Sequence, residues 1–134
     1  MAKILDIEGI GPVYKQRLTA IGITTTNKLL KKGATPKGRE ELAKKTDISG
    51  SLILEWVNHA DLFRIKGVAE EYSDLLEEAG VDTVPELAQR NPENLYAKLV
   101  EVNDLKKLVR QLPSQRQVAD WVQQAKTMPR KIQY

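Results

Sequence analysis

The sequence contains no cysteine and only one histidine, His59. Without cysteine it can form neither a disulfide nor a thiolate metal site, and one histidine leaves a transition metal with carboxylate ligands alone. It contains no Ser–His–Asp arrangement, no P-loop and no dinucleotide fingerprint. The sequence therefore predicts a protein that is not an enzyme and has no metal, no cofactor and no small-molecule substrate. We expect His59 at the surface or half-buried.

Long apolar runs are absent as well. No segment approaches the stretch of about 20 apolar residues that a membrane-spanning helix needs, and the first residues do not form a signal peptide. Together with the lack of cysteine, this predicts a cytoplasmic protein with no membrane partner. Aromatic residues make up only 5% of the chain, so Leu, Ile, Val and Ala must fill the core.

The sequence repeats itself. At an offset of 58 residues, matching pairs include Gly9 and Gly67, Ile10 and Val68, Gly11 and Ala69, Tyr14 and Tyr72, Leu18 and Leu76, and Gly22 and Gly80. Later pairs, Trp56 with Trp121 and Ala60 with Ala125, have an offset of 65, so the second copy gains about seven residues near 89–116. This order of matches predicts two units, 1–62 and 63–134.

Helical signals recur through both copies, and no stretch alternates apolar and polar residues as a strand does. Val118, Trp121, Val122 and Ala125 fall on one helix face, and we expect both Trp residues in the core. Further signals are Pro at the first helical position after Thr35 and Asn91, capping boxes at Thr83–Glu86 and Ser114–Gln117, and helix-ending glycines at 22 and 80.

These signals predict an all-α fold of short helices. We expect the two duplicated units to pack into one compact domain that shares a core. The helix around Trp56 should run on to Ile65 and lead directly into the second unit.

The most informative segment is Gly9-Ile10-Gly11-Pro12. Two glycines permit backbone angles and close approach that Cβ atoms would prevent, while Ile10 fills the space between two helices. Successive amide groups then face outward at a helix N-terminus, where they suit a phosphate group.

This segment resembles the helix-hairpin-helix motif. The resemblance implies a hairpin that holds the nucleic-acid backbone without reading bases, and a monovalent cation near Glu8 to Gly11. Val13 and Lys15 depart from the usual pattern, which often has a basic residue at the first position and a small one at the second. Over its whole length, the chain resembles an uncharacterised, largely bacterial family of duplicated helix-hairpin-helix proteins of unknown function.

The second hairpin departs further from the motif. Ala69 replaces the second glycine, and Glu70, Glu71 and Asp74 lie where a phosphate would bind. Acidic residues at a helix N-terminus favour the helix dipole but repel phosphate. We expect this hairpin to keep its fold without the anion site.

Charge is distributed unevenly along the chain. Residues 1–62 carry ten basic and seven acidic residues, while 63–134 carry eleven of each. The charged residues of 28–45 are mostly basic, and those of 70–86 are all acidic. The leading hypothesis is sequence-independent binding to a DNA or RNA backbone through the first unit. Its site residues would be Gly9, Ile10, Gly11, Val13, Lys15, Arg17, Lys28, Lys31 and Lys32. The alternative is a module for protein interaction or self-association that binds no nucleic acid.

Overall fold

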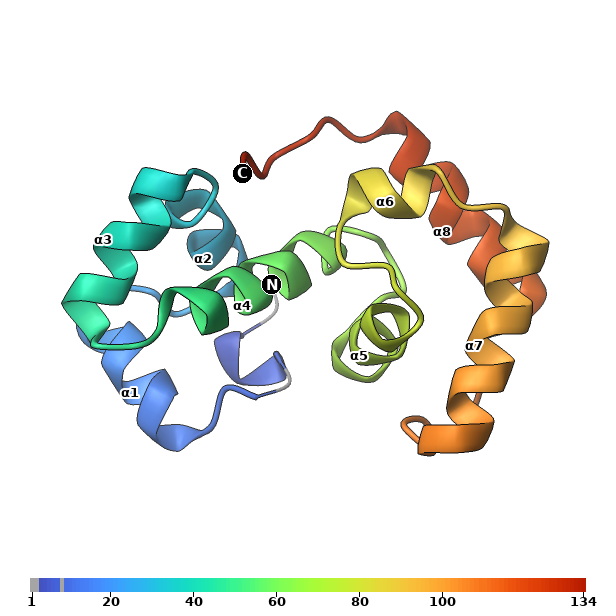
Figure 1. Ribbon diagram of the computed structural model, residues 1–134, viewed down its shortest axis with the longest axis horizontal. Helices are drawn as coiled ribbons and strands as arrows, with labels where there is room; N and C mark the ends of the chain where they lie inside the picture. The colour runs from blue at the N-terminus through green and yellow to red at the C-terminus, as the bar shows by residue number, and fades with distance from the viewer. Residues whose placement is uncertain (1–2, 8) are drawn as a thin grey trace. The chain divides into compact units, whose positions relative to one another are not determined.

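The computed structural model of the chain is all-helical in the residues it describes, 3–7 and 9–134 (Figure 1). These residues form eight α-helices and one short 3-10 helix. The elements are η1 (Ile4–Asp6), α1 (Pro12–Ala20), α2 (Thr26–Lys32), α3 (Pro36–Thr46), α4 (Gly50–Leu62), α5 (Glu70–Glu78), α6 (Val84–Ala88), α7 (Pro92–Lys106) and α8 (Gln115–Thr127). The predicted all-α class is confirmed. None of the described helices is long and apolar enough to cross a membrane.

The chain divides into two compact units. Unit 1 comprises Met1–Asp61 together with Lys131–Tyr134, and unit 2 comprises Leu62–Arg130. The last four residues therefore pack with the first unit, although the repeat assigns them to the second copy. That both copies share a single core stays a prediction.

Unit 1 is built around α4. Trp56 and Val57 on this helix are completely buried, and Ile53 and Ala60 extend the same apolar stripe. The unit also buries aliphatic residues from its other helices and connecting segments: Ile4, Ile7, Ile10, Leu18, Ile23, Leu29, Leu42 and Ile48. Burial of this aliphatic surface is the main source of stability in such a small unit.

Unit 2 has its own apolar core. Its last helix, α8, packs against α6 and α7, and α5 packs against α7. Trp121 of α8 is 1% exposed, so both Trp residues lie in cores as predicted. The other buried members include Leu62, Ile65, Leu75, Leu76, Val81, Leu87, Leu95, Leu99, Val118 and Val122.

Most of the predicted helix caps are present. The side chains of Thr35 and Asn91 accept hydrogen bonds from the amides of Gly38 and Asn94, each at 3.0 Å. Ser114 and Gln117 form the full reciprocal box, at 3.1 and 2.8 Å. These caps place the starts of α3, α7 and α8 where the sequence predicts them.

The box predicted at Thr83 and Glu86 is wrong. Thr83 is buried and its side chain caps nothing, while the carboxylate of Glu86 accepts from the amide of Asp82 at 3.4 Å. Burial of the Thr83 side chain in unit 2 takes precedence over the local capping pattern.

The helix around Trp56 ends earlier than predicted. It stops at Leu62 rather than Ile65, and two turns follow: the amide of Ile65 bonds the carbonyl of Leu62 at 3.0 Å, and that of Val68 bonds Ile65 at 3.1 Å. The first turn takes residues 63–65 out of the helix because the chain must already bend toward the second hairpin.

The extra residues of the second copy lengthen one helix and one loop. Helix α7 has 15 residues where α3 has 11. The side chain of Asn103 holds the loop that follows α7. Its Nδ2 donates to the backbone carbonyl of Val109 at 3.2 Å, and its Oδ1 accepts from the backbone amide of Val109 at 3.0 Å.

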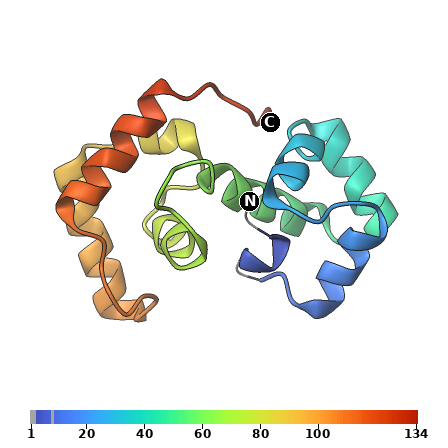
Figure 2. The same ribbon diagram turned by 180° about the vertical axis from the view of Figure 1, so that it is seen from behind.

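The C-terminal segment lies along the turn between α2 and α3 (Figure 1 and Figure 2). The amide of Gln133 donates to the carbonyl of Ala34 at 2.7 Å, and Ile132 is 2% exposed. Arg39 donates to the carbonyls of Gly33 and Gln133, both at 2.8 Å. Burial lowers the pKa of the Arg39 guanidinium, with an opposing contribution from Tyr134, but this group stays charged at neutral pH.

Candidate functional site

The Gly9–Gly11 hairpin joins η1 to α1. Gly9 has φ +95°, a left-handed conformation that favours glycine, and the amide of Ile10 bonds the carbonyl of Ile7 at 3.2 Å. Ile10 is 4% exposed, so it fills the space beneath the hairpin as the sequence predicts. Gly11 then caps the N-terminus of α1 in an extended conformation.

The corresponding residues of unit 2 have the same local geometry. Gly67 has φ +98°, and a Cβ there would lie 3.1 Å from Nε1 of Trp121; the equivalent distance from Gly9 to Trp56 is 3.4 Å. The tyrosine of each unit packs on its tryptophan in the same tilted manner. Ring centroids are 5.1 Å apart for Tyr14–Trp56 and 5.4 Å apart for Tyr72–Trp121.

The predicted steric role of the second glycine is wrong. Gly11 has φ −87°, which any residue adopts, and nothing lies within 4 Å of the place its Cβ would occupy. Ala69 stands at the matching N-cap with a similar extended backbone, φ −129° and ψ −162°. Only Gly9 and Gly67 therefore need to be glycine for the hairpin to form, and the absence of a side chain at Gly11 leaves the start of α1 open.

The N-terminus of α1 has no side-chain cap. The first helical hydrogen bond runs from the amide of Lys15 to the carbonyl of Gly11, at 2.9 Å. The amides of Val13 and Tyr14 precede it, so they have no acceptor within the helix and can bind an external one. No acidic residue lies in this first turn, whereas Glu70 and Glu71 occupy the first turn of α5.

Three of the predicted site residues belong to α1 itself. Val13 is 61% exposed, and Lys15 borders an apolar surface hollow of about 640 Å³ that Leu5, Pro12 and Ala20 also line. Arg17 is exposed but already engaged. Its guanidinium donates to the carbonyl of Asp47 at 3.3 Å and lies 5.9 Å from the centre of the Tyr14 ring.

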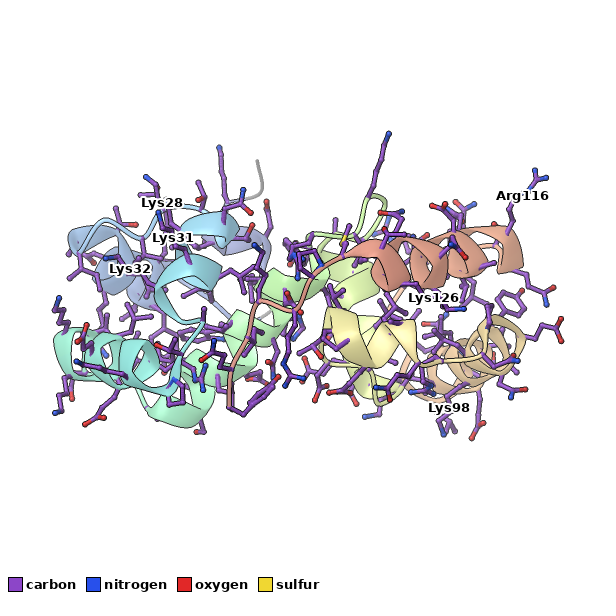
Figure 3. All side chains as sticks on the ribbon, turned by 90° about the horizontal axis from the view of Figure 1, so that it is seen from above. Lys28, Lys31, Lys32, Lys98, Arg116 and Lys126 are labelled. Carbon is purple, nitrogen blue, oxygen red and sulfur yellow. The ribbon has the colours of Figure 1, made fainter. Side chains whose placement is uncertain are left out.

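The predicted lysines lie elsewhere in unit 1. Lys28, Lys31 and Lys32 are neighbours on the surface of α2 (Figure 3). They surround Ile21–Ile23, the segment that follows α1, whereas the hairpin precedes α1. A nine-residue helix spans about 13 Å, so the predicted site residues form two separate clusters.

His59 is buried, and the expectation of a surface or half-buried position is wrong. It is 3% exposed because it lies near Trp56 on the inward part of α4. Its match in the second copy, Gln124, bonds both the amide and the carbonyl of Lys66, at 2.8 and 3.0 Å. Residue 66 corresponds to Glu8 in the first copy. Glu8 lies outside the described residues, so this part of the cation site implied at Glu8 to Gly11 is not described.

No group of three or more metal-ligating side chains occurs within residues 3–7 and 9–134. The features that the sequence interpretation missed are the C-terminal segment on Arg39 and the apolar residues between the lysines. Only the apolar residues between the lysines could have been found from the local sequence, because lysines spaced three and four residues apart follow Ile21 and Ile23 closely in the sequence.

No curated protein and no solved structure matches the chain. One protein family matches residues 8–128, a span that includes both hairpins and both tryptophans. The chain therefore belongs to the family described as a domain of unknown function, DUF4332.

Proposed function

We propose that the two units are copies of one helix-hairpin-helix and that the first binds a nucleic-acid backbone without regard to sequence or catalysis. The repeated pairs Gly9–Trp56 and Gly67–Trp121 support the common origin. The observation that carries the binding proposal is the uncapped start of α1, where Gly11 leaves the amides of Val13 and Tyr14 open. A phosphate oxygen is the acceptor that such an N-terminus favours.

The charge of each unit supports the assignment to the first hairpin. Unit 1 has eleven basic and seven acidic residues, and unit 2 has ten basic and eleven acidic. A polyanion is therefore attracted to unit 1 and weakly repelled by unit 2. Glu70 and Glu71 add local repulsion at the start of α5.

The decisive experiment places a carboxylate on the proposed phosphate site. In Gly11→Asp, the new side chain has room and a suitable backbone, and it would cap α1 itself. We expect the free energy of unfolding to stay within about 0.5 kcal/mol of the parent or to rise. Binding of a fluorescent oligonucleotide, measured by anisotropy at low salt, should be lost. Ala69→Asp makes the matched change at α5 and should leave binding unaltered.

The parent protein should bind duplexes of unrelated sequence equally, with a plot of log K against log salt that falls by about 0.9 per phosphate contacted. Binding that prefers one sequence, or that survives in Gly11→Asp, would exclude the hairpin as the contact site.

The second candidate is a protein-interaction module, and the apolar hollow favours it. Leu5, which lines that hollow, is 40% exposed, and Val13 on α1 is 61% exposed. Exposed apolar side chains of this size are typical of protein-binding surfaces. If the hollow binds another copy of the chain, sedimentation should show association that Leu5→Glu abolishes while oligonucleotide binding is absent in both proteins.

A further inference from the structure

The second cluster of lysines surrounds a hollow of its own. Residues Ile21, Gly22, Ile23, Lys28, Lys31 and Lys32, here called the lysine hollow, enclose about 280 Å³. A smaller hollow of about 80 Å³ shares Ile21, Ile23 and Lys32 with it and adds Lys45 and Glu41. The lysine hollow itself has no acidic residue in its lining.

The positions of the three lysines work against the stability of α2. They are spaced three and four residues apart, so their charges lie on one helix face and repel one another. Lys31 and Lys32 in the last turn favour the helix dipole, but Lys28 is the third residue of the helix, where a cation is unfavourable. Helix stability therefore does not account for the cluster.

No described carboxylate forms an ion pair with these lysines, although Glu41 lines the smaller hollow together with Lys32. None of the ion pairs found in residues 3–7 and 9–134 involves Lys28, Lys31 or Lys32, and the ammonium group of Lys28 has only the hydroxyl of Thr24, at 3.2 Å. In contrast, Lys44 pairs with Glu40 and Lys98 with Glu101. The labelled basic residues of unit 2 lie far apart along α7 and α8, unlike the three lysines of α2 (Figure 3).

The floor between the lysines is apolar. Ile21 and Ile23 supply it, and Gly22 adds no side chain: it has φ +88° and open space where a Cβ would be. The amides of Gly22 and Ile23 already bond the carbonyls of Thr19 and Leu18. An anion would therefore be held by ammonium groups rather than by backbone, while the floor contacts an uncharged part of the same ligand.

We propose that the lysine hollow binds a sugar phosphate, with the phosphate between the three ammonium groups and the sugar on Ile21 and Ile23. The ligand class rests on the proposed function, because a nucleic-acid backbone presents this group repeatedly. A free nucleotide carries the same chemistry. This is a second phosphate site, separated from the hairpin by the length of α1.

The test measures the two sites separately. Amide shifts of the full chain are followed by NMR during titration with inorganic phosphate, thymidine monophosphate and an eight-residue oligothymidine. Gly22 and Ile23 report on the lysine hollow, and Val13 and Tyr14 report on the hairpin. The variant carries Lys28→Gln, Lys31→Gln and Lys32→Gln; the control carries Lys37→Gln, Lys44→Gln and Lys126→Gln, which remove equal charge elsewhere.

We expect the oligonucleotide to shift Gly22 and Ile23, and the triple variant to weaken its binding about tenfold or more while the control changes it less than about threefold. The salt slope should fall by about 0.7 in the variant, because the three lysines hold one phosphate and each phosphate contacted on a single strand contributes about 0.7. Shifts caused equally by thymidine monophosphate would support the site with a free nucleotide as its source.

Three results would overturn the inference: no ligand shifts Gly22 and Ile23, the variant behaves as the control does, or inorganic phosphate alone binds as well as the sugar-bearing ligands. Shifts confined to Val13 and Tyr14 would overturn it while upholding the proposed function. Shifts confined to the lysine hollow would uphold it and overturn the hairpin proposal. All six lysines are exposed, so both triple variants should fold, and their thermal melts check this.

Discussion

The indole of Trp56 lies against Gly9, with its Nε1 3.4 Å from where a Cβ of that glycine would be. Gly9 also has φ +95°, so its backbone requires glycine, while the distance to Trp56 would be ordinary van der Waals contact for a Cβ. The conformation of the hairpin thus requires glycine at position 9. It does not require glycine at position 11, where the missing side chain leaves the start of α1 open.

Gly9→Ala should therefore destabilise the protein far more than Gly11→Ala. The left-handed backbone costs an alanine about 1–2 kcal/mol. Gly11→Ala should change the free energy of unfolding by less than about 0.5 kcal/mol. Urea unfolding followed by circular dichroism measures both. Equal destabilisation by the two variants would show that Gly11 is under steric constraint after all.

The indole N–H of Trp56 gives a second prediction. It is buried and has no hydrogen-bond partner among the described residues. An unpaired buried donor costs about 1–3 kcal/mol. Replacing Trp56 by benzothienylalanine, in which sulfur stands in place of N–H, should raise the free energy of unfolding by about 1 kcal/mol. The same replacement at Trp121 serves as the matched comparison and should give no such gain. A loss of stability at Trp56 would mean that its N–H is bonded in solution.

Restoring the second hairpin should create a second phosphate site. The changes are Ala69→Gly, Glu70→Pro and Glu71→Lys, at an N-cap whose extended backbone any of these sequences can adopt. Affinity for duplex DNA should rise and the salt slope should steepen by about 0.9 for each new contact. The control exchanges Glu93 and Glu101 on α7 for Gln and Lys, which gives the same change in charge away from the hairpin. If neither the parent nor the restored protein binds at low salt, the nucleic-acid hypothesis fails and the interaction-module hypothesis replaces it.

Arg39→Lys should detach the C-terminal segment. Arginine reaches the carbonyls of Gly33 and Gln133 together, and a single ammonium group cannot reproduce that geometry. We expect a loss of about 2 kcal/mol in stability, together with faster hydrogen exchange at the amide of Gln133. Lys37→Arg, on the exposed side of α3, should change neither quantity. Unaltered exchange at Gln133 in Arg39→Lys would show that Ala34 and Ile132 hold the segment without Arg39.

The features that sequence predicted well are those set by neighbouring residues. Thr35, Asn91 and Ser114 cap helices because the acceptor and the amide are only three residues apart. Thr83 has the same pattern and fails, because its burial depends on distant residues. Gly9 and Gly11 are alike in sequence, yet only the position of Trp56 and the backbone angles tell them apart.

The least predictable features are contacts between distant residues. Nothing near Arg39 indicates that it bonds a residue 94 positions later, and nothing near Ile132 indicates that it is buried in the first unit. The candidate lysines could be chosen from charge alone. Their grouping around Ile21–Ile23, away from the hairpin, depends on how α1 and α2 pack.

The position of Lys131–Tyr134 in unit 1 has a consequence for how the chain is made. The ribosome delivers residues in order, and domains generally fold as they emerge. Unit 2 is continuous and can form as soon as Arg130 is available, whereas unit 1 must wait, with Arg39 and the α2–α3 turn uncovered, until all of unit 2 has been synthesised. Of the two units, the one that is translated first is thus the last to be completed.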